Sequence, residues 1–121
     1  MDSDLRCLAS AIYFESKGEP LAGQLAVAEV IMNRAGSGRF PSSICSVVTQ
    51  PGQFSFVRGG RLPTISSTNR AFRDAVAVAQ VALTNSWSSN APKALYFHAR
   101  SVKPGWRQLR VATIGNHIFY R

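Results

Sequence analysis

Two carboxylates four residues apart, Glu15 and Glu19, have the best placement in the sequence for acid–base chemistry. Glu15 follows Tyr13 and Phe14 in the last turn of an expected helix. There the negative end of the helix dipole and the apolar neighbours both disfavour the carboxylate anion. These effects predict a carboxyl group that stays protonated near neutral pH, as a general acid for a glycosidic oxygen must. Glu19 precedes Pro20 at the start of the next expected helix, where free amide groups and the dipole favour the anion.

Contrasting environments of this kind are a recognised sign of an acid–base pair. Spacing alone leaves the alternative equally open: Glu15 would be a surface residue and Glu19 only a helix cap. Few other acids compete, because the chain has only six Asp and Glu residues. Glu29 lies in a very apolar helix and needs a buried partner, for which we expect Asn33 or Arg34, so we interpret it as structural or supporting.

Polar aromatic segments are suited to lining a sugar groove, because sugars present apolar ring faces and hydroxyl edges. The candidates are Gln53-Phe54-Ser55-Phe56, Tyr96-Phe97-His98 and Trp106-Arg107. Ordinary core packing explains each segment about as well. His98 and His117 are more typical of structural hydrogen bonding than of a catalytic base. A Cys–His peptidase would need a free thiol beside one of them, and we give that reading little weight.

The elements that must position these residues are helical first and strand-like later. Helical periodicity predicts helices over residues 3–16, from Glu19-Pro20 to Arg34, and over 68–83, with Ser3 or Asp4 capping the first. A short helix is expected over 41–48 and a polar loop over 85–92. Alternation predicts strands over 53–57, 94–98, 110–114 and 117–120. With 121 residues, the chain is expected to form one α+β domain, 1–121.

The chain carries a formal net charge of +8, which favours an anionic partner such as nucleic acid, an acidic membrane or bacterial wall polymer. A merely soluble basic surface is the alternative. Scattered basic residues argue against a dedicated nucleic-acid arm, and no apolar stretch is long enough to span a membrane. The acidic N-terminus does not resemble a signal peptide. Export by another route, a removed leader and a phage-encoded lysis protein all remain open.

Two cysteines, Cys7 and Cys45, allow one disulfide and lack the paired spacing of a zinc site, so we expect no metal. A bridge would close a loop of roughly 38 residues, which the chain-entropy model rates at about 4 kcal/mol. Two buried, unpaired thiols are the alternative, and the bridge is slightly favoured. If it forms, the protein belongs to an oxidising compartment.

Taken together, these segments resemble the cell wall hydrolase family that includes the spore cortex-lytic enzymes. The resemblance covers nearly the whole chain, and the ordered set of motifs is far more specific than any one of them. The motifs are residues 11–20 (AIYFESKGEP), 23–34 (GQLAVAEVIMNR), Arg39-Phe40-Pro41, Ser46-Val47-Val48, Gln53-Phe54-Ser55-Phe56, residues 94–98 (ALYFH) and residues 114–120 (IGNHIFY).

The resemblance implies a lysozyme-like domain that cleaves the glycan strands of peptidoglycan. It implies that Glu15 is the catalytic glutamate, that Ser16 completes the Glu-Ser pair ending a helix in many lytic transglycosylases, and that Glu19 is the second motif acid. Some relatives carry two further cysteines near the Gln-Phe-Ser-Phe segment. Here Gly52 and Arg58 lie nearby instead, which leaves Cys7 and Cys45 as natural partners.

A single-glutamate enzyme of this kind can release a 1,6-anhydro sugar without a second carboxylate, and this is the expected reaction. The alternatives are a hydrolytic muramidase or glucosaminidase with Glu19 as base or electrostatic partner, and a non-catalytic basic module that binds the wall. The expected partner is peptidoglycan, with no cofactor, no nucleic acid, no membrane insertion and a monomeric state. The expected place of action is the periplasm, the cell wall or the extracellular space.

Overall fold

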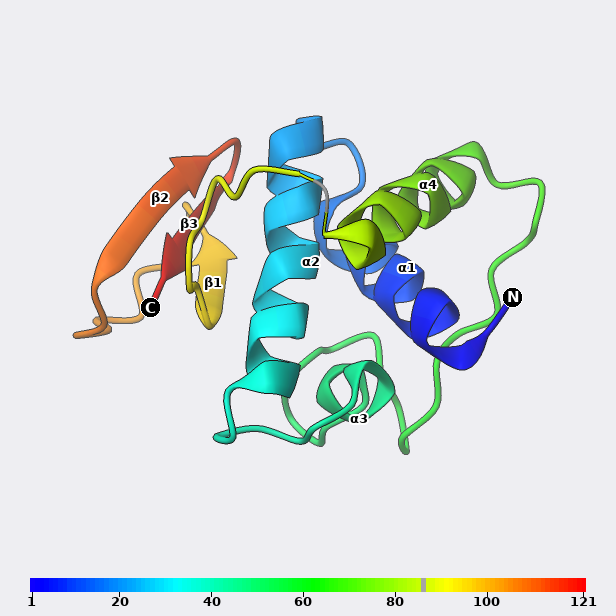
Figure 1. Ribbon diagram of the computed structural model, residues 1–121, viewed down its shortest axis with the longest axis horizontal. Helices are drawn as coiled ribbons and strands as arrows, with labels where there is room; N and C mark the ends of the chain where they lie inside the picture. The colour runs from blue at the N-terminus through cyan, green and yellow to red at the C-terminus, as the bar shows by residue number, and fades with distance from the viewer. Residues whose placement is uncertain (86) are drawn as a thin grey trace.

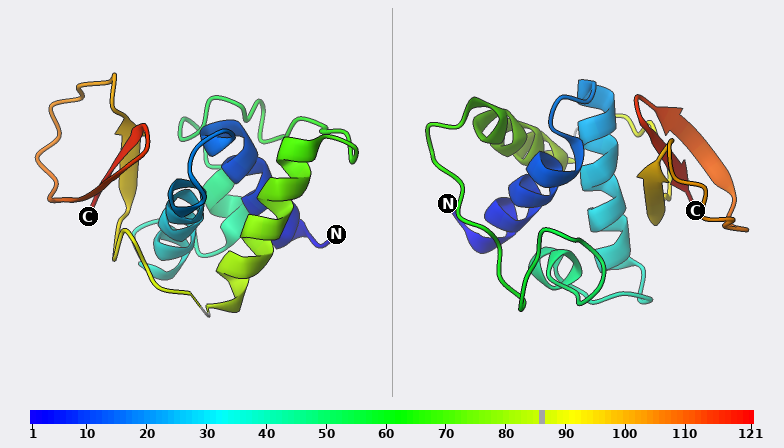
Figure 2. Two further views of the ribbon diagram at one scale, coloured as in Figure 1. Left: turned by 90° about the horizontal axis from the view of Figure 1, so that it is seen from above. Right: turned by 180° about the vertical axis from the view of Figure 1, so that it is seen from behind.

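The computed structural model describes residues 1–85 and 87–121 and consists of a helical body with a small sheet against one side (Figure 1). The chain forms α1 (Ser3–Ser16), α2 (Leu21–Gly36), α3 (Ile44–Val48), α4 (Arg70–Thr84), β1 (Tyr96–Ala99), β2 (Arg110–Ile114) and β3 (His117–Tyr120). Helix α2 stands between the sheet and helices α1 and α4, as all three views agree (Figure 2). The α+β prediction, with helices first and short strands last, is confirmed.

The first helix positions Glu15, and local chemistry explains both of its ends. Asp2, rather than the predicted Ser3 or Asp4, caps it, and its carboxylate accepts a hydrogen bond of 3.0 Å from the Leu5 amide. The side chain of Ser16 donates to the Ile12 carbonyl at 2.8 Å in the last turn. Most of the helix is buried, so the core fixes its direction and thereby the position of Glu15.

The other helices lie within a few residues of their predicted ranges. Helix α2 begins at Leu21, with Pro20 before its first turn, and it packs on the sheet, α1, α3 and α4. Helix α3 is shorter than predicted because it begins only after Ser43, whose hydroxyl accepts from the Ser46 amide. Part of the predicted 85–92 loop, residue 86, lies outside the described residues.

The predicted strand over 53–57 is wrong, because this segment forms consecutive turns. The Gln53 amide donates to the Gln50 carbonyl and the Val57 amide to the Phe54 carbonyl, each at 3.2 Å. The rings of Phe54 and Phe56 stack on each other within these turns, at 5.5 Å between centroids. Aromatic packing therefore explains the alternating pattern, since no neighbouring strand pairs with this segment among the described residues.

The three strands form an antiparallel sheet in the order β1-β3-β2. A two-residue turn, Gly115-Asn116, joins β2 to β3, and its glycine has a φ of 55°. The first strand begins later than predicted, at Tyr96, although the Leu95 amide already donates to the Tyr120 carbonyl at 2.8 Å. Phe119, on the central strand, is completely buried and joins the sheet to the helical core.

A disulfide links Cys7 on α1 to Cys45 on α3, with 5.3 Å between the two Cα atoms. It fastens the first half of α1 to the helical body at the end away from Glu15. No helix in the described part of the chain is both long and apolar enough to cross a lipid bilayer.

Candidate active site

A cleft of about 440 Å³ lies where the end of α1, the end of α2, the 52–54 turn and the sheet meet. Apart from Glu15 itself, it brings together six of the residues that the sequence proposed for substrate binding. Its lining consists of Glu15, Arg34, Gly52, Gln53, Phe54, Tyr96, Phe97, His98, Ala99, Trp106 and His117. Among these described residues Glu15 is the only carboxylate, so any acid–base chemistry in the cleft centres on it.

Glu15 is half-buried, and burial raises the pKa of its carboxyl group above the usual range. Within the described part of the chain it has no hydrogen-bond or ion-pair partner to stabilise the anion. Its neighbour Phe14 stacks on Phe56 at 4.8 Å, and Tyr13 accepts a hydrogen bond of 3.0 Å from Asn69. The end of α1 is thus held by its neighbours, while the Glu15 carboxyl is unpaired among the described residues and keeps its proton to higher pH than an ordinary glutamate.

Glu19 does not line the cleft and has a different environment from the one predicted. We expected the amides of α2 to stabilise it, but its carboxylate binds the turn between β2 and β3. Oε1 accepts from the Asn116 backbone amide at 2.7 Å and Oε2 from the Asn116 side chain at 3.1 Å. A Cβ atom at Gly115 would lie 2.5 Å from Oε1, so the turn needs glycine for this approach as well as for its φ. Glu19 therefore fastens the sheet to the loop after α1.

His117 follows this turn and, like Glu15, lines the cleft. Its Nδ1 atom lies 3.7 Å from Glu19 Oε1 and is buried, with no hydrogen-bond partner among the described residues. Burial lowers the pKa of His117, the Glu19 carboxylate partly offsets this, and His98 lowers the pKa further. His117 is accordingly neutral at pH 7, and Glu19 contributes to fixing its position.

His98 and the aromatic residues around it form one wall of the cleft. Its Nδ1 donates to the Ala99 carbonyl at 2.7 Å, and its Nε2 is 2.8 Å from the Tyr120 hydroxyl. Both ring nitrogens are therefore engaged, as expected of a structural histidine. Trp106 packs edge-on against His98 at 5.0 Å between centroids and against Tyr96 at 5.9 Å, yet remains 38% exposed. An exposed indole ring in a cleft is a suitable platform for a sugar ring.

Arg34 is a cleft residue that the sequence analysis did not assign to the site. It was considered only as a partner for Glu29, and that expectation is wrong. Glu29 instead accepts a hydrogen bond from Ser89, while Asn33 donates to the Ala94 carbonyl at 3.0 Å. Arg34 donates to the Leu95 carbonyl at 2.7 Å and to Gln53 Oε1 at 3.2 Å. The available signal was a cation at the end of a largely apolar helix, beyond the three- or four-residue spacing that would pair it with Glu29.

Besides Glu19, four candidate residues from the sequence lie outside the cleft: Ser16, Ser55, Phe56 and Arg107. Ser16 is buried, and its hydroxyl donates within its own helix, so it stabilises the turn that carries Glu15. Ser55 is exposed in the turns after Phe54 and does not line the cleft.

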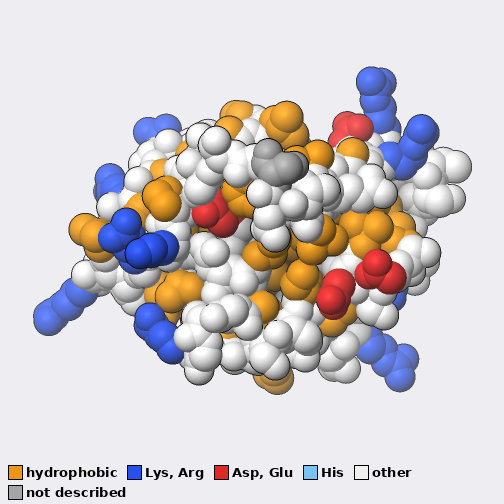
Figure 3. Space-filling model, viewed as in Figure 1, with side chains coloured by type: hydrophobic (Ala, Val, Ile, Leu, Met, Phe, Trp, Pro, Cys, Tyr) orange, Lys and Arg blue, Asp and Glu red, His pale blue; other side chains and the backbone are white. Residues whose placement is uncertain are grey.

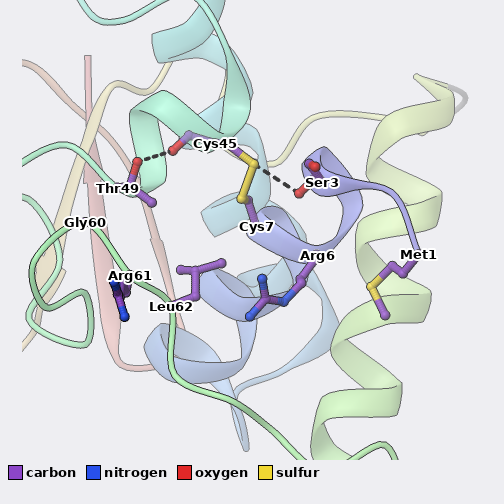
Figure 4. A pocket seen from close by; sticks show the side chains of 9 residues that line it. All are labelled: Met1, Ser3, Arg6, Cys7, Cys45, Thr49, Gly60, Arg61 and Leu62. Carbon is purple, nitrogen blue, oxygen red and sulfur yellow. Dashed lines mark hydrogen bonds between the residues drawn. A yellow bond between two sulfur atoms is a disulfide. The ribbon is translucent and has the colours of Figure 1, made fainter.

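A larger hollow of about 670 Å³ surrounds the disulfide on another part of the surface (Figure 4). Arg6, Arg61 and Leu62 are among its lining residues, and no carboxylate or histidine lines it in the described chain. Volume alone would favour this hollow, but it lacks a proton donor or acceptor suited to catalysis. We therefore assign the site to the smaller cleft. On the face seen in Figure 3, Lys and Arg side chains lie around the periphery rather than in one patch.

Comparison with known proteins agrees with this assignment of the fold. Residues 18–120 match the sequence model of the cell wall hydrolase family. The chain belongs to the cell wall hydrolase family. The resemblance drawn from the motifs is therefore confirmed. Because the match begins after Glu15, the role of this glutamate rests on the geometry of the cleft.

Spore cortex-lytic enzymes are similar to this cell wall hydrolase over almost its whole length. The enzyme of Bacillus subtilis (strain 168) is 35% identical over 120 residues, which are 98% of this chain and 37% of that protein. The enzyme of Oceanobacillus iheyensis is 35% identical over 121 residues, 97% of this chain and 41% of that protein. The chain thus spans about two fifths of the length of these curated relatives.

Two solved structures share the fold. The catalytic domain of the germination-specific lytic transglycosylase SleB from Bacillus anthracis superposes with a TM-score of 0.78 at 34% identity. The match covers 98% of this chain and 93% of that one. The catalytic domain of the Bacillus cereus SleB protein gives a TM-score of 0.77 at 34% identity, with coverage of 98% and 89%.

Proposed function

We propose that this cell wall hydrolase cleaves the glycan strands of peptidoglycan as a lytic transglycosylase, with Glu15 as its acid and base. The observation that carries the proposal is the half-buried carboxyl of Glu15, unpaired among the described residues and with a raised pKa, in a cleft without a second carboxylate. The similarity to the catalytic domain of a lytic transglycosylase supports the same reaction.

In the proposed reaction the Glu15 carboxyl first gives its proton to the glycosidic oxygen as the bond from that oxygen to C1 of the muramyl residue breaks. The muramyl 6-hydroxyl then attacks C1, and its proton passes to the Glu15 carboxylate. The products are a 1,6-anhydromuramyl end and a new free hydroxyl on the leaving strand. The protonated acid is regenerated, no water is consumed and no cofactor is required.

Hydrolysis with Glu19 as the base is the alternative, and the geometry favours it less. Both carboxylate oxygens of Glu19 accept hydrogen bonds from Asn116, and Glu19 does not line the cleft. A base for water must reach a water molecule on the far side of the sugar ring from the acid. We therefore propose that Glu19 supports the site by holding the turn that precedes His117.

The remaining cleft residues are proposed to bind the strand. Trp106 and Tyr96 offer aromatic surface to sugar rings, while Gln53 and His117 offer polar atoms to their substituents. His98 supports this wall through its contact with Trp106, since both of its ring nitrogens are engaged. Phe54 packs beneath this surface, since it is buried. We further propose that the protein acts as a monomer in the periplasm, the cell wall or the extracellular space, where its substrate lies.

The test is digestion of purified peptidoglycan sacculi followed by mass spectrometry of the released muropeptides. We expect anhydro-muropeptides from the wild type and almost none from Glu15→Gln, which keeps the shape of the side chain but cannot supply the proton. Asp74→Asn, a change to an exposed acid on α4 outside the cleft, is the matched control and should retain full activity. Hydrated products would identify a muramidase or glucosaminidase. Salt-sensitive binding to sacculi without any product would identify a non-catalytic wall-binding module.

A further inference from the structure

Arg34 is a buried cation without a carboxylate partner in the described part of the chain. Its side chain is only 6% exposed, and its guanidinium lies over the rings of Phe40 and Tyr96, at 4.8 and 5.7 Å from their centroids. Aromatic faces and the Leu95 carbonyl compensate part of the cost of removing this charge from water. None of these partners neutralises the charge, so the wall of the cleft keeps a positive charge.

The hydrogen bonds of Arg34 leave one end of its guanidinium unused. Nε donates to Leu95 and Nη1 to Gln53, whereas Nη2 has no partner among the described residues. Nη2 is not among the fully buried unpaired atoms, so it remains accessible. Because Arg34 lines the cleft, a ligand in the cleft can approach it. The free N–H groups of Nη2 are therefore available to a ligand in the cleft.

Gln53 supplies a second donor beside the first. A guanidinium can only donate, so the side-chain oxygen of Gln53 must face Arg34 and its NH₂ group must point elsewhere. Gln53 is exposed and lines the same cleft, which leaves this amide group free to donate as well. One cationic and one neutral donor side by side suit the two oxygens of a carboxylate.

The charge of Arg34 is not directed at the catalytic acid. Its guanidinium donates to Leu95 and Gln53, and no ion pair joins it to Glu15 among the described residues. Burial raises the pKa of Glu15, whereas a guanidinium bound to that carboxyl would lower it, which agrees with the absence of this ion pair. Glu15 therefore leaves the free end of Arg34 available to a ligand.

We propose that Arg34 and Gln53 form a subsite that binds a carboxylate carried by the glycan strand. This inference rests on the proposed function, because it takes peptidoglycan as the substrate. In peptidoglycan this chemistry has two sources: the lactyl carboxylate of a muramyl residue without a stem peptide, and a carboxylate of the stem peptide itself. Such a subsite would distinguish muramyl strands from uncharged polymers of N-acetylglucosamine.

The experiment measures binding of small ligands to the wild-type protein by calorimetry, in two matched pairs. The first pair is the N-acetylglucosaminyl-N-acetylmuramic acid disaccharide with a free lactyl carboxylate and the same disaccharide as its lactyl methylamide. The second pair is the disaccharide-peptide with free stem carboxylates and with those carboxylates amidated. A preference of about tenfold for the acid, as expected for charge-assisted hydrogen bonds, assigns the lactyl or the stem carboxylate according to the pair. Equal binding within both pairs would overturn the proposal.

Gln53→Glu is the matched variant, because an exposed carboxylate beside Arg34 keeps the guanidinium paired while occupying the subsite. We expect it to fold with an unchanged or higher melting temperature and to lose the preference for the acid. An undiminished preference in this variant would also overturn the proposal. Digestion of sacculi tests the proposed function independently of these binding measurements. Anhydro products together with equal binding of acid and amide would refute only the subsite. A preference for the acid without any anhydro product would refute only the proposed catalysis.

Discussion

The disulfide between Cys7 and Cys45 fastens the helix that carries Glu15, and removing it should lower stability by an amount that the structure sets. The two residues are separated by 38 positions. In the chain-entropy model, a cross-link that closes a loop of this length contributes about 4 kcal/mol by restricting the unfolded chain. Each kcal/mol shifts the melting temperature of a domain of this size by about 4 °C. The expected loss is therefore several degrees, with an upper bound of about 15 °C.

The double variant Cys7→Ser, Cys45→Ser avoids a stray thiol, and Cys45→Ser alone limits the packing change because Cys45 is partly exposed while Cys7 is buried. Thermal unfolding followed by circular dichroism, with and without reductant, is the assay. We expect the reduced wild type and the double variant to melt at a similar, lower temperature. Below that temperature both should keep most of their activity, because Glu15 lies about two helical turns from Cys7.

Thiol titration of the denatured, non-reduced protein gives the direct check on the cross-link. Two free thiols per chain, in protein prepared under oxidising conditions, would refute it. If no thiol is found but reductant leaves the melting temperature unchanged, the bridge exists and the loop-entropy reasoning about its contribution is wrong.

Two further predictions concern the carboxylates near the sheet. Because burial raises the pKa of Glu15, the folded state holds this proton to higher pH than the unfolded chain does. The contribution of this group to the free energy of unfolding is therefore complete in acid and falls as the pH rises through the folded-state pKa. Calorimetry should show Glu15→Gln melting above the wild type at pH 7 but level with it near pH 4, about the pKa of an unperturbed glutamate; a constant gap would contradict this. Glu19→Ala removes both bonds to Asn116 and should lower kcat on soluble glycan strands, at a stability cost of about 1 kcal/mol for each exposed bond. Asn116→Ala keeps the backbone bond and should have the smaller effect on kcat, so the reverse order would count against a positioning role for Glu19.

Sequence patterns predicted those features that depend on near neighbours along the chain. The range of α1 followed from its apolar period and its end signals, and the helical setting of Glu15 followed with it. The two strands over 110–114 and 117–120 were also predicted, and the Gly115-Asn116 pair between them is typical of a turn. The strand predicted from Gln53 to Val57 is wrong for a physical reason. Alternating aromatic residues occur both in strands and in turns that stack their rings.

Contacts between residues far apart in the sequence were not predictable from one chain. Glu19 and Asn116 are separated by 97 positions, and only the folded sheet brings them together. Arg34 and Asn33 were expected as partners of Glu29 because a buried carboxylate needs one, but the hydrogen bonds of Arg34 go to Leu95 and Gln53. The spacing of charges along one helix does not reveal which carbonyl groups another segment will present to it.

The placement of the sheet explains why these distant residues belong to one site. Helix α2 of 16 residues measures about 24 Å, and side chains near both of its ends bind the sheet. At its start Glu19 holds the β2–β3 turn, and at its end Asn33 and Arg34 hold the carbonyls that precede β1. The cleft is lined by Glu15 from α1, by Arg34 from the end of α2 and by residues of the sheet. The groups at the two ends of α2 therefore fix the sheet relative to the end of α1, and with it the aromatic wall of the cleft relative to the Glu15 carboxyl.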